Sequence, residues 1–267
     1  MSSPCHKLLL ALSLIVAGSV QAEERLLRVC ADPDNLPYSN AAGEGFENRI
    51  AELIAQDLNA KLEYDWWPQR RGFVRRTLGA GMCELLIGVP ADFERVSTTR
   101  PYYRSSYVFV TRAGDLVPDF ADPAIRTRRI GVQLIGNDMA ATPAGHALSR
   151  AGATANVTGF TIFGDGPAAQ RMADAVHAGS IDAALVWGPQ AGHFAARTQA
   201  PLKVSIARPP AGTPEPFEFD VALGVKRGNR ALLEELDGVL VRKRREIDAI
   251  LAQYHVPRTD AAAGEGR

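Results

Sequence analysis

The sequence has little of what marks metal sites, nucleic-acid binding and the common enzyme motifs. It has three cysteines, no C-x-x-C pair and scattered histidines, so we expect no metal site. Its 30 basic and 30 acidic residues cancel, which argues against nucleic-acid binding, because a basic domain is expected there. It contains no G-x-S-x-G, P-loop, G-x-G-x-x-G, H-E-x-x-H or EF-hand motif. We therefore expect no catalytic residues, and binding rather than catalysis.

The first 22 residues have the features of an export signal, and their apolar run is too short to span a membrane. Lys7 precedes the apolar run LLLALSLIVAG, and SVQA follows it as a small-x-small pattern. This order predicts a secretory signal at 1–22 that is cleaved after Ala22. A membrane-spanning helix needs roughly 20 apolar residues, so we expect an exported, soluble protein that does not span the membrane.

Two cysteines, Cys30 and Cys83, remain after removal of the signal. In an oxidising compartment an isolated pair is a candidate disulfide, and we predict that the two form one. Two buried free thiols are the alternative that the sequence leaves open.

The first part of the mature chain alternates strand-like and helical patterns. Strands are predicted at 26–31, 61–66 and 84–89, with helical spacing of apolar residues at 46–58 and 69–81 between them. This βαβαβ order indicates a parallel sheet flanked by helices.

A second βαβ series begins near residue 128. Two strand-like runs, 105–115 and 217–229, flank this series, and a long helical pattern follows at 230–256. If the second run returns the chain to the first lobe, two strands join the lobes and let a cleft between them open and close. The predicted elements of the series are strand 128–134, a helix in 138–150 interrupted or begun at Pro143, strand 155–160, helix 167–179, strand 180–187 and a short helix at 189–197.

The predicted architecture is a two-lobed α/β fold. Each lobe is a mostly parallel sheet flanked by helices, and two hinge strands join the lobes. The expected divisions are the cleaved signal at 1–22, a discontinuous lobe 1 at 23–111 and 214–258, lobe 2 at 112–213, and a disordered tail at 259–267.

Ligands of open α/β sheets bind beyond the carboxyl ends of the strands, which places three loops of lobe 1 at the cleft. One of these loops contains WWPQRR. Trp66 and Trp67 are consecutive, so one should enter the core while the other reaches the cleft or solvent. Arg70 and Arg71 either contact an anionic partner or form a solvated charged face, and the sequence leaves both possibilities open.

The other loops and the hinge supply the remaining candidates. Tyr38 either stacks on a ligand or shields the core, and Asp32 in the same loop is more readily explained as a turn former. Arg95 has a guanidinium suited to a carboxylate or phosphate, or to an ion pair with Glu94 or Asp92. The predicted ligand- or partner-binding set is Asp32, Tyr38, Trp66, Trp67, Arg70, Arg71, Arg95, Tyr102, Tyr103, Asn137 and Trp187.

Several segments, in order and across nearly the whole mature chain, resemble a known family. ADPDNLPYSN, GEGFENRIAELIA, WWPQRRGFVRRTL, GVPADFERVSTTRPYYRSSYVFV, VWGPQAG and FEFDVALGVKRG resemble extracellular solute-binding proteins of the type II periplasmic-binding fold. More specifically, they resemble the MxaJ/XoxJ-type proteins associated with quinoprotein methanol and alcohol dehydrogenases. The Cys30 and Cys83 pair fits that resemblance.

Two departures distinguish the chain from amino-acid-binding members. Trp187 stands where those members usually have an acidic residue for the ligand's ammonium group. The arginine that holds the ligand's carboxylate in those members is represented only by Arg95, in PADFER. Ordinary amino-acid binding is therefore not expected.

The resemblance implies a periplasmic, non-catalytic accessory protein that supports assembly or activation of a dehydrogenase dependent on pyrroloquinoline quinone (PQQ). That methanol or alcohol dehydrogenase would be its partner. The chain has no cofactor of its own, and PQQ is either handled in the cleft or present only in the partner. The resemblance leaves open whether the cleft binds the cofactor, a peptide of the dehydrogenase or a small solute. The alternatives are a receptor that delivers a small polar or anionic solute to an ABC permease, and a dehydratase with Glu94, Asp138 or His146 as acid or base.

Overall fold

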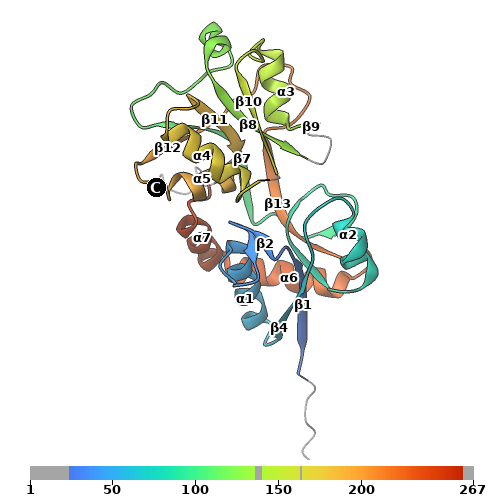
Figure 1. Ribbon diagram of the computed structural model, residues 1–267. Helices are drawn as coiled ribbons and strands as arrows, with labels where there is room; N and C mark the ends of the chain where they lie inside the picture. Colours follow the sequence, from blue (N-terminus) through green and yellow to red (C-terminus); the bar gives the residue numbers. More distant parts are fainter. Residues whose placement is uncertain (1–23, 136–139, 163, 261–267) are drawn as a thin grey trace, which may run out of the picture.

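The computed structural model describes residues 24–135, 140–162 and 164–260, which form two α/β lobes (Figure 1). The predicted signal peptide, the candidate Asn137 and the predicted tail from residue 261 onward lie outside the described residues. None of the helices within the described residues is long and apolar enough to cross a membrane.

Lobe 1, the lower lobe of Figure 1, is built on a sheet in the order β13-β5-β1-β4. β1 pairs in parallel with both β4 and β5, as the βαβαβ pattern predicts, whereas β13 is antiparallel to β5. The elements of this lobe, apart from β13, are β1 (Leu26–Ala31), β2 (Asp34–Asn35), β3 (Ser39–Asn40), α1 (Phe46–Asp57), β4 (Lys61–Trp66), α2 (Phe73–Arg76), the 3-10 helix η1 (Leu78–Ala80), β5 (Leu85–Pro90), β6 (Ser97–Thr98), α6 (Arg230–Arg242) and α7 (Arg244–Gln253).

The alternation of side chains along the strands gives this sheet two apolar faces. Leu27 and Val29 of β1 pack in one cluster with Ile50 and Ile54 of α1 and with apolar residues of α6 and α7. Each such fully buried side chain contributes about 2 kcal/mol to the free energy of unfolding. Cys30 points to the opposite face, where α2 and η1 lie.

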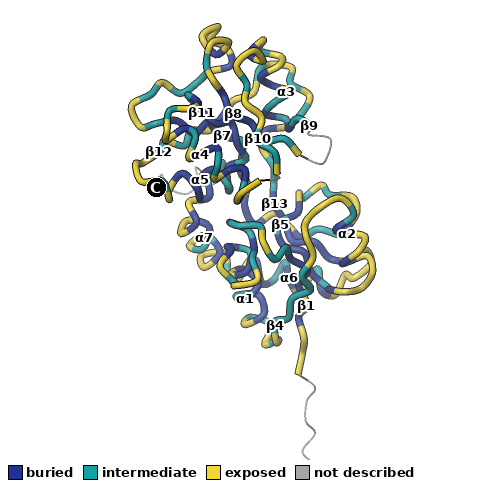
Figure 2. Tube along the Cα trace, viewed as in Figure 1, coloured by how far each residue is buried: buried dark blue, intermediate teal, exposed yellow. Residues whose placement is uncertain are grey.

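Lobe 2, the upper lobe, continues the sheet in the order β10-β8-β11-β7, with β12 also paired to β7. Its central strands β7, β8 and β11 are mostly buried between α3 on one face and α4 and α5 on the other, whereas β10 and β12 are more exposed (Figure 2). α3 begins at Pro143, one of the two alternatives expected. The elements are η2 (Pro123–Thr127), β8 (Ile130–Ile135), β9 (Ala140–Ala141), α3 (Pro143–Arg150), β10 (Val157–Thr161), α4 (Ala168–His177), β11 (Ala183–Trp187), α5 (Gly188–Ala195) and β12 (Leu202–Ile206).

Two antiparallel strands, β7 (Tyr103–Arg112) and β13 (Glu218–Val225), run between the lobes. β7 pairs with β13 up to Ser106 and with β11 and β12 from Tyr107 onward. One continuous hydrogen-bonded ladder therefore connects the two lobes. The exact domain boundaries, predicted at residues 111/112 and 213/214, stay a prediction.

The C-terminal segment forms a further contact between the lobes. His193 of α5, in lobe 2, stacks on Tyr254, which follows α7, with ring centroids 5.8 Å apart and an interplanar angle of 12°. Ser105 Oγ donates a hydrogen bond to the carbonyl of Pro257 (2.6 Å). The backbone N–H of Thr259 donates to the Arg104 carbonyl (3.1 Å), so the chain is held on β7 at a residue that we predicted to begin the disordered tail.

The helix predicted at 69–81 is wrong in extent. Only α2 and the short η1 form: Gly72 adopts a left-handed backbone conformation (φ of 91°) just before α2, and Thr77, with φ of −108° and ψ of −93°, separates α2 from η1. The apolar residues Phe73 and Leu78 are nevertheless buried on the sheet, as expected for one side of this segment.

The single helix predicted at 230–256 is two helices that break at Lys243, where φ is −102° and ψ is 16°. The break lies within a run of four basic residues. Arg242 pairs with Asp57 of α1 (Nε to Oδ2 3.2 Å), whereas Arg244 pairs within α7. No proline occurs at the break, and the non-helical backbone angles are confined to Lys243.

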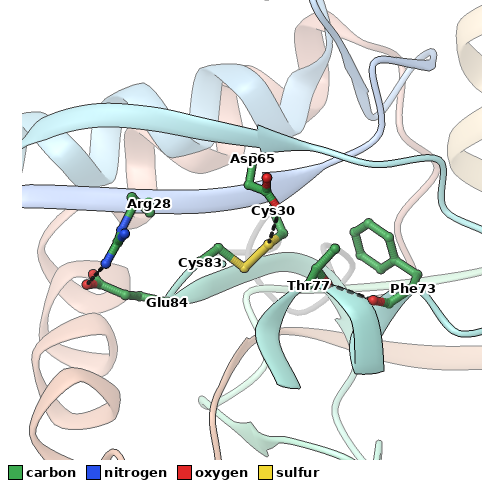
Figure 3. The surroundings of a disulfide bond; sticks show 7 residues. All are labelled: Arg28, Cys30, Asp65, Phe73, Thr77, Cys83 and Glu84. Carbon is green, nitrogen blue, oxygen red and sulfur yellow. Dashed lines mark hydrogen bonds and ion pairs between the residues drawn. A yellow bond between two sulfur atoms is a disulfide. The ribbon is translucent and has the colours of Figure 1, made fainter. Parts of the chain in front are cut away.

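The predicted Cys30–Cys83 disulfide is confirmed, with the two Cα atoms 5.5 Å apart. It joins Cys30 of β1 to Cys83, which lies two residues before β5 begins at Leu85 (Figure 3). Phe73 and Thr77 lie beside it, and the Thr77 hydroxyl donates to the Phe73 carbonyl (2.8 Å). The disulfide thus ties the segment that contains the basic WWPQRR sequence back to the centre of the lobe 1 sheet.

Candidate ligand-binding cleft

A cleft of ≈ 320 Å³ lies at the junction of the two lobes. It lies where the carboxyl ends of β1, β4, β5 and β11 meet the hinge strands, as expected for an open α/β sheet. The volume lies within the range of small-molecule sites in proteins. The residues that line the cleft are Tyr38, Glu47, Gln69, Gly88, Pro90, Tyr103, Tyr107, Trp187, Phe219 and Val221.

Aromatic rings from three strands form one wall of this cleft. Trp187, at the end of β11, lies edge-to-face with Tyr107 of β7 (centroids 5.6 Å apart) and with Phe219 of β13 (5.5 Å). Burial raises the pKa of Tyr107 to about 12, so its phenol is neutral at physiological pH. Trp187 also packs against the core of lobe 1, so this wall spans the two lobes.

Tyr38 and Tyr103 supply aromatic surface from lobe 1. Tyr38 packs on Phe46 of α1 (centroids 5.4 Å apart), and Phe46 in turn packs on Tyr103 (6.3 Å). Burial is the main cause that raises the pKa of both tyrosines, and Glu47 raises both further. Both phenols are therefore neutral hydrogen-bonding groups in the cleft.

Among the described residues that line the cleft, Glu47 is the one with a carboxyl side chain. It is the second residue of α1, and its backbone N–H donates to the Tyr38 carbonyl (2.9 Å). Burial raises the pKa of Glu47 well above its ordinary value. Within residues 24–135, 140–162 and 164–260, no hydrogen bond or ion pair reaches its carboxyl group.

Gly88 makes room for the Glu47 carboxyl group. It lies in β5 with φ of 76°, beside the irregular pairing with β13, and a Cβ atom there would be 1.9 Å from Glu47 Oε1. The glycine also shifts the alternation of β5: Leu86 and Val89, three residues apart, pack on the same face. A glycine in a β-strand thus leaves the space that the carboxyl group of a first-turn helical residue occupies at the cleft.

Gln69 is fixed at the cleft by the loop that follows β1. Its backbone N–H donates to Oδ2 of Asp32, and its side-chain oxygen accepts from Asn35 Nδ2 (2.9 Å). Asp32 also accepts from the N–H of Asp34 (2.9 Å), which is the turn-forming role expected for it. Asp32 therefore lies at the cleft margin and positions Gln69.

The predicted site residues fall into three groups in the structure. Tyr38, Tyr103 and Trp187 line the cleft. Tyr102 is buried in the lobe 1 core against Tyr103. Asp32, Trp66, Trp67, Arg70, Arg71 and Arg95 lie outside the lining set, and their roles stay predictions.

The two neighbouring tryptophans occupy different environments. Trp66 is half-buried and stacks on Tyr64 two residues earlier (centroids 4.4 Å apart, interplanar angle 17°). Trp67 is 41% exposed, and the Arg76 guanidinium lies 5.6 Å from the centre of its ring. Neither ring lines the cleft.

Arg95 is exposed in the turn after β5 rather than at the cleft. Two successive turns, from Phe93 N–H to the Pro90 carbonyl and from Val96 N–H to the Phe93 carbonyl, carry the chain away from the cleft. Val96 then buries on the disulfide side of the sheet. The alternative ion pairs of Arg95 with its acidic neighbours are not formed within the described residues.

Sequence reasoning missed Glu47, Gly88 and Phe219 as cleft residues. The helix predicted at 46–58 begins at Phe46 as expected, which makes Glu47 its second residue. Glu47 could have been found from its place at the start of a predicted helix, next to the strand ends that meet at the cleft. The sequence does not reveal the contact between Glu47 and Gly88, because the two residues lie far apart in the chain.

The cleft lining does not fit pyrroloquinoline quinone. This cofactor is a tricarboxylate, so a buried site for it needs cationic partners. Among the described lining residues there is no Arg or Lys, and Glu47 would repel it. In the described chain no cluster of His, Cys, Asp or Glu could hold a metal ion either.

Two lobes of this topology, joined by paired strands with an aromatic cleft between them, define a periplasmic-binding-protein fold. No protein-family model matches the chain. The chain is 30% identical to protein MoxJ of Paracoccus denitrificans, over 92% of this chain and 94% of that protein. It therefore belongs to the family of MxaJ/XoxJ-type, solute-binding-like proteins.

Solved structures agree with this assignment. The periplasmic binding protein XoxJ from Methylobacterium extorquens AM1 is 34% identical, with a TM-score of 0.73 over 87% of this chain and 99% of that chain. MxaJ from Methlophaga aminisulfidivorans MPT has the same fold, with a TM-score of 0.74 and 24% identity over 87% of this chain and 99% of that one.

Proposed function

We propose that the protein is a periplasmic, non-catalytic accessory protein that supports assembly or activation of a PQQ-dependent methanol or alcohol dehydrogenase. The observation that carries this proposal is the relationship to MoxJ and XoxJ, which extends over both lobes. The poor fit of the cleft to the quinone favours the version in which PQQ belongs to the partner enzyme.

The surface that we propose for the dehydrogenase is the basic rim, defined as Trp67, Arg70, Arg71, Arg75 and Arg76. Trp67 is an exposed aromatic ring of the kind enriched in protein interfaces. Arg71 and Arg75 are exposed and form no ion pair within the described part of the chain. An aromatic ring beside several guanidinium groups suits an acidic protein surface.

A pull-down tests this surface. The mature protein is the bait in a periplasmic extract, and captured dehydrogenase is identified by mass spectrometry. We expect Trp67→Ala with Arg71→Ala to capture several-fold less dehydrogenase than the wild type, since buried aromatic and arginine anchors dominate interfaces. Val241→Ala with Arg245→Ala, which changes an exposed apolar and an exposed basic side chain on α6 and α7, is the matched control. Equal capture by both double variants would contradict the proposed surface.

A receptor for an ABC permease is the second candidate, because the cleft has the volume of a small-solute site. A small solute that raises the melting temperature, with no dehydrogenase captured, would favour this candidate. The dehydratase candidate has less support: Glu94 is exposed and His146 pairs with Glu215 on lobe 2, so neither lines the cleft, and Asp138 lies outside the described residues.

A further inference from the structure

We propose that the cleft binds a small organic cation, an alkylated ammonium compound, between its aromatic rings and the Glu47 carboxylate. The geometry that carries this inference is one carboxyl group among the aromatic residues that line the cleft. The inference goes beyond the contact with a dehydrogenase and does not depend on it.

The first argument is charge. Glu47 lines the cleft, and within the described residues no cation pairs with it. A buried carboxylate without a partner is costly, and a cation next to it removes much of that cost. A ligand with one positive charge would therefore gain from Glu47, whereas an anionic ligand would lose.

The second argument is the chemistry of the walls. Trp187, Tyr107 and Phe219 form a connected set of rings on the hinge side, and Tyr38 and Tyr103 face the cleft from lobe 1. Aromatic faces attract cations through the ring quadrupole, most strongly for tryptophan, and rings surrounding an ammonium group are a recognised arrangement. Alkyl groups on the nitrogen would also gain by burial against these rings.

The third argument is that the carboxyl position is built into the fold. The missing Cβ of Gly88 gives Glu47 its place, and the Tyr38 carbonyl fixes the first turn of α1. The carboxyl group therefore occupies space that a side chain at position 88 would fill, next to a first helical turn that is fixed by its backbone.

The lining also discriminates between amines and amino acids. An amino acid carries a carboxylate as well as an ammonium group, and no described lining residue is a cation that could hold it. Gln69 offers an amide for one polar contact with a ligand hydroxyl. The ligand class is therefore a simple monocation, with or without a hydroxyl group, rather than a zwitterion.

Calorimetry with choline as probe tests the proposal on the mature protein. We expect choline to bind and 3,3-dimethylbutan-1-ol, its neutral isostere of the same shape, to bind at least about tenfold more weakly. Glycine betaine, which adds a carboxylate, is also expected to bind more weakly than choline. No choline binding at millimolar concentration, or equal binding of the neutral isostere, overturns the proposal.

Variants assign the binding to the cleft. Glu47→Gln keeps the shape of the side chain and removes its charge, so we expect about tenfold weaker choline binding. Trp187→Leu is expected to weaken it as well. Glu52→Gln, which changes an exposed acid of α1 that pairs with Arg49, is the matched control and should bind choline as the wild type does. Wild-type affinity in Glu47→Gln overturns the proposal.

The pH dependence gives an independent readout. Ionisation of Glu47 is required for the attraction, and the titratable groups near it are the tyrosines Tyr38, Tyr64, Tyr102 and Tyr103, whose pKa values are all raised. Choline affinity should therefore rise with pH above the ordinary range of a glutamate pKa, and Glu47→Gln should abolish this rise. Glu47→Gln should still capture the dehydrogenase, which separates failure of this inference from failure of the proposed function.

Discussion

His193 should make the unfolding free energy of this protein depend on pH. Its side chain is 3% exposed, and the Arg197 guanidinium donates to its Nδ1 atom (2.9 Å). That bond requires Nδ1 to be unprotonated. Burial, followed by the charges of Arg197 and His255, lowers the pKa of His193 from 6.5 to about 4.

The sign of the effect follows from the lowered pKa. Between the ordinary and the folded pKa, the unfolded chain binds a proton at His193 that the folded protein does not. Stability is therefore complete above the ordinary value and falls as the pH drops from about 6.5 toward about 4. Each pKa unit is worth about 1.4 kcal/mol, so the loss amounts to about 3 kcal/mol.

The assay is urea denaturation across this pH range for the wild type and for His193→Phe. Phenylalanine keeps a ring against Tyr254 but cannot titrate. The wild type should lose about 3 kcal/mol more than the variant, because carboxylates that titrate in the same range affect both proteins alike. His177→Gln, which removes an exposed imidazole from α4, is the control. Parallel stability curves for the wild type and His193→Phe would refute the reasoning.

Two further stability measurements test the cleft and the disulfide. Because the pKa of Glu47 is raised, the wild type should lose stability as the pH rises from the ordinary glutamate value toward the folded one, and Glu47→Gln should remove this slope in urea denaturation. The double variant Cys30→Ala with Cys83→Ala opens a loop with a sequence separation of 53 and should lower the unfolding free energy by about 4 kcal/mol. An unchanged urea midpoint would show that the disulfide does not constrain the unfolded chain.

The sequence predicted the two-lobed fold because its periodicities are strong. The strand-like runs of β1 and β4, the continuous apolar run of β5 and the helical spacing in α1 each agree with the topology that they form. The pattern at 69–81 had the same helical spacing, but its glycines take left-handed conformations that the spacing does not reveal. The break at Lys243 was equally hidden, since no proline or glycine marks it in the sequence.

The cleft was predictable in position but only partly in composition. Tyr38, in the loop after the first strand, and Trp187, singled out by the resemblance, both line it. Arg95 was assigned by its order in the chain, and the consecutive turns that carry it away could not be read from the sequence. Glu47 escaped notice because its environment is made by Gly88, on another element.

The position of Trp187 has a spectroscopic consequence. Its indole lies on a lobe 2 strand yet packs against the lobe 1 core, so separation of the lobes exposes more of this half-buried ring to water. Trp66 and Trp67, the other two tryptophans, both lie on lobe 1 and can be replaced by phenylalanine. The chain therefore contains its own fluorophore at the hinge, and its emission wavelength reports how far the lobes stand apart.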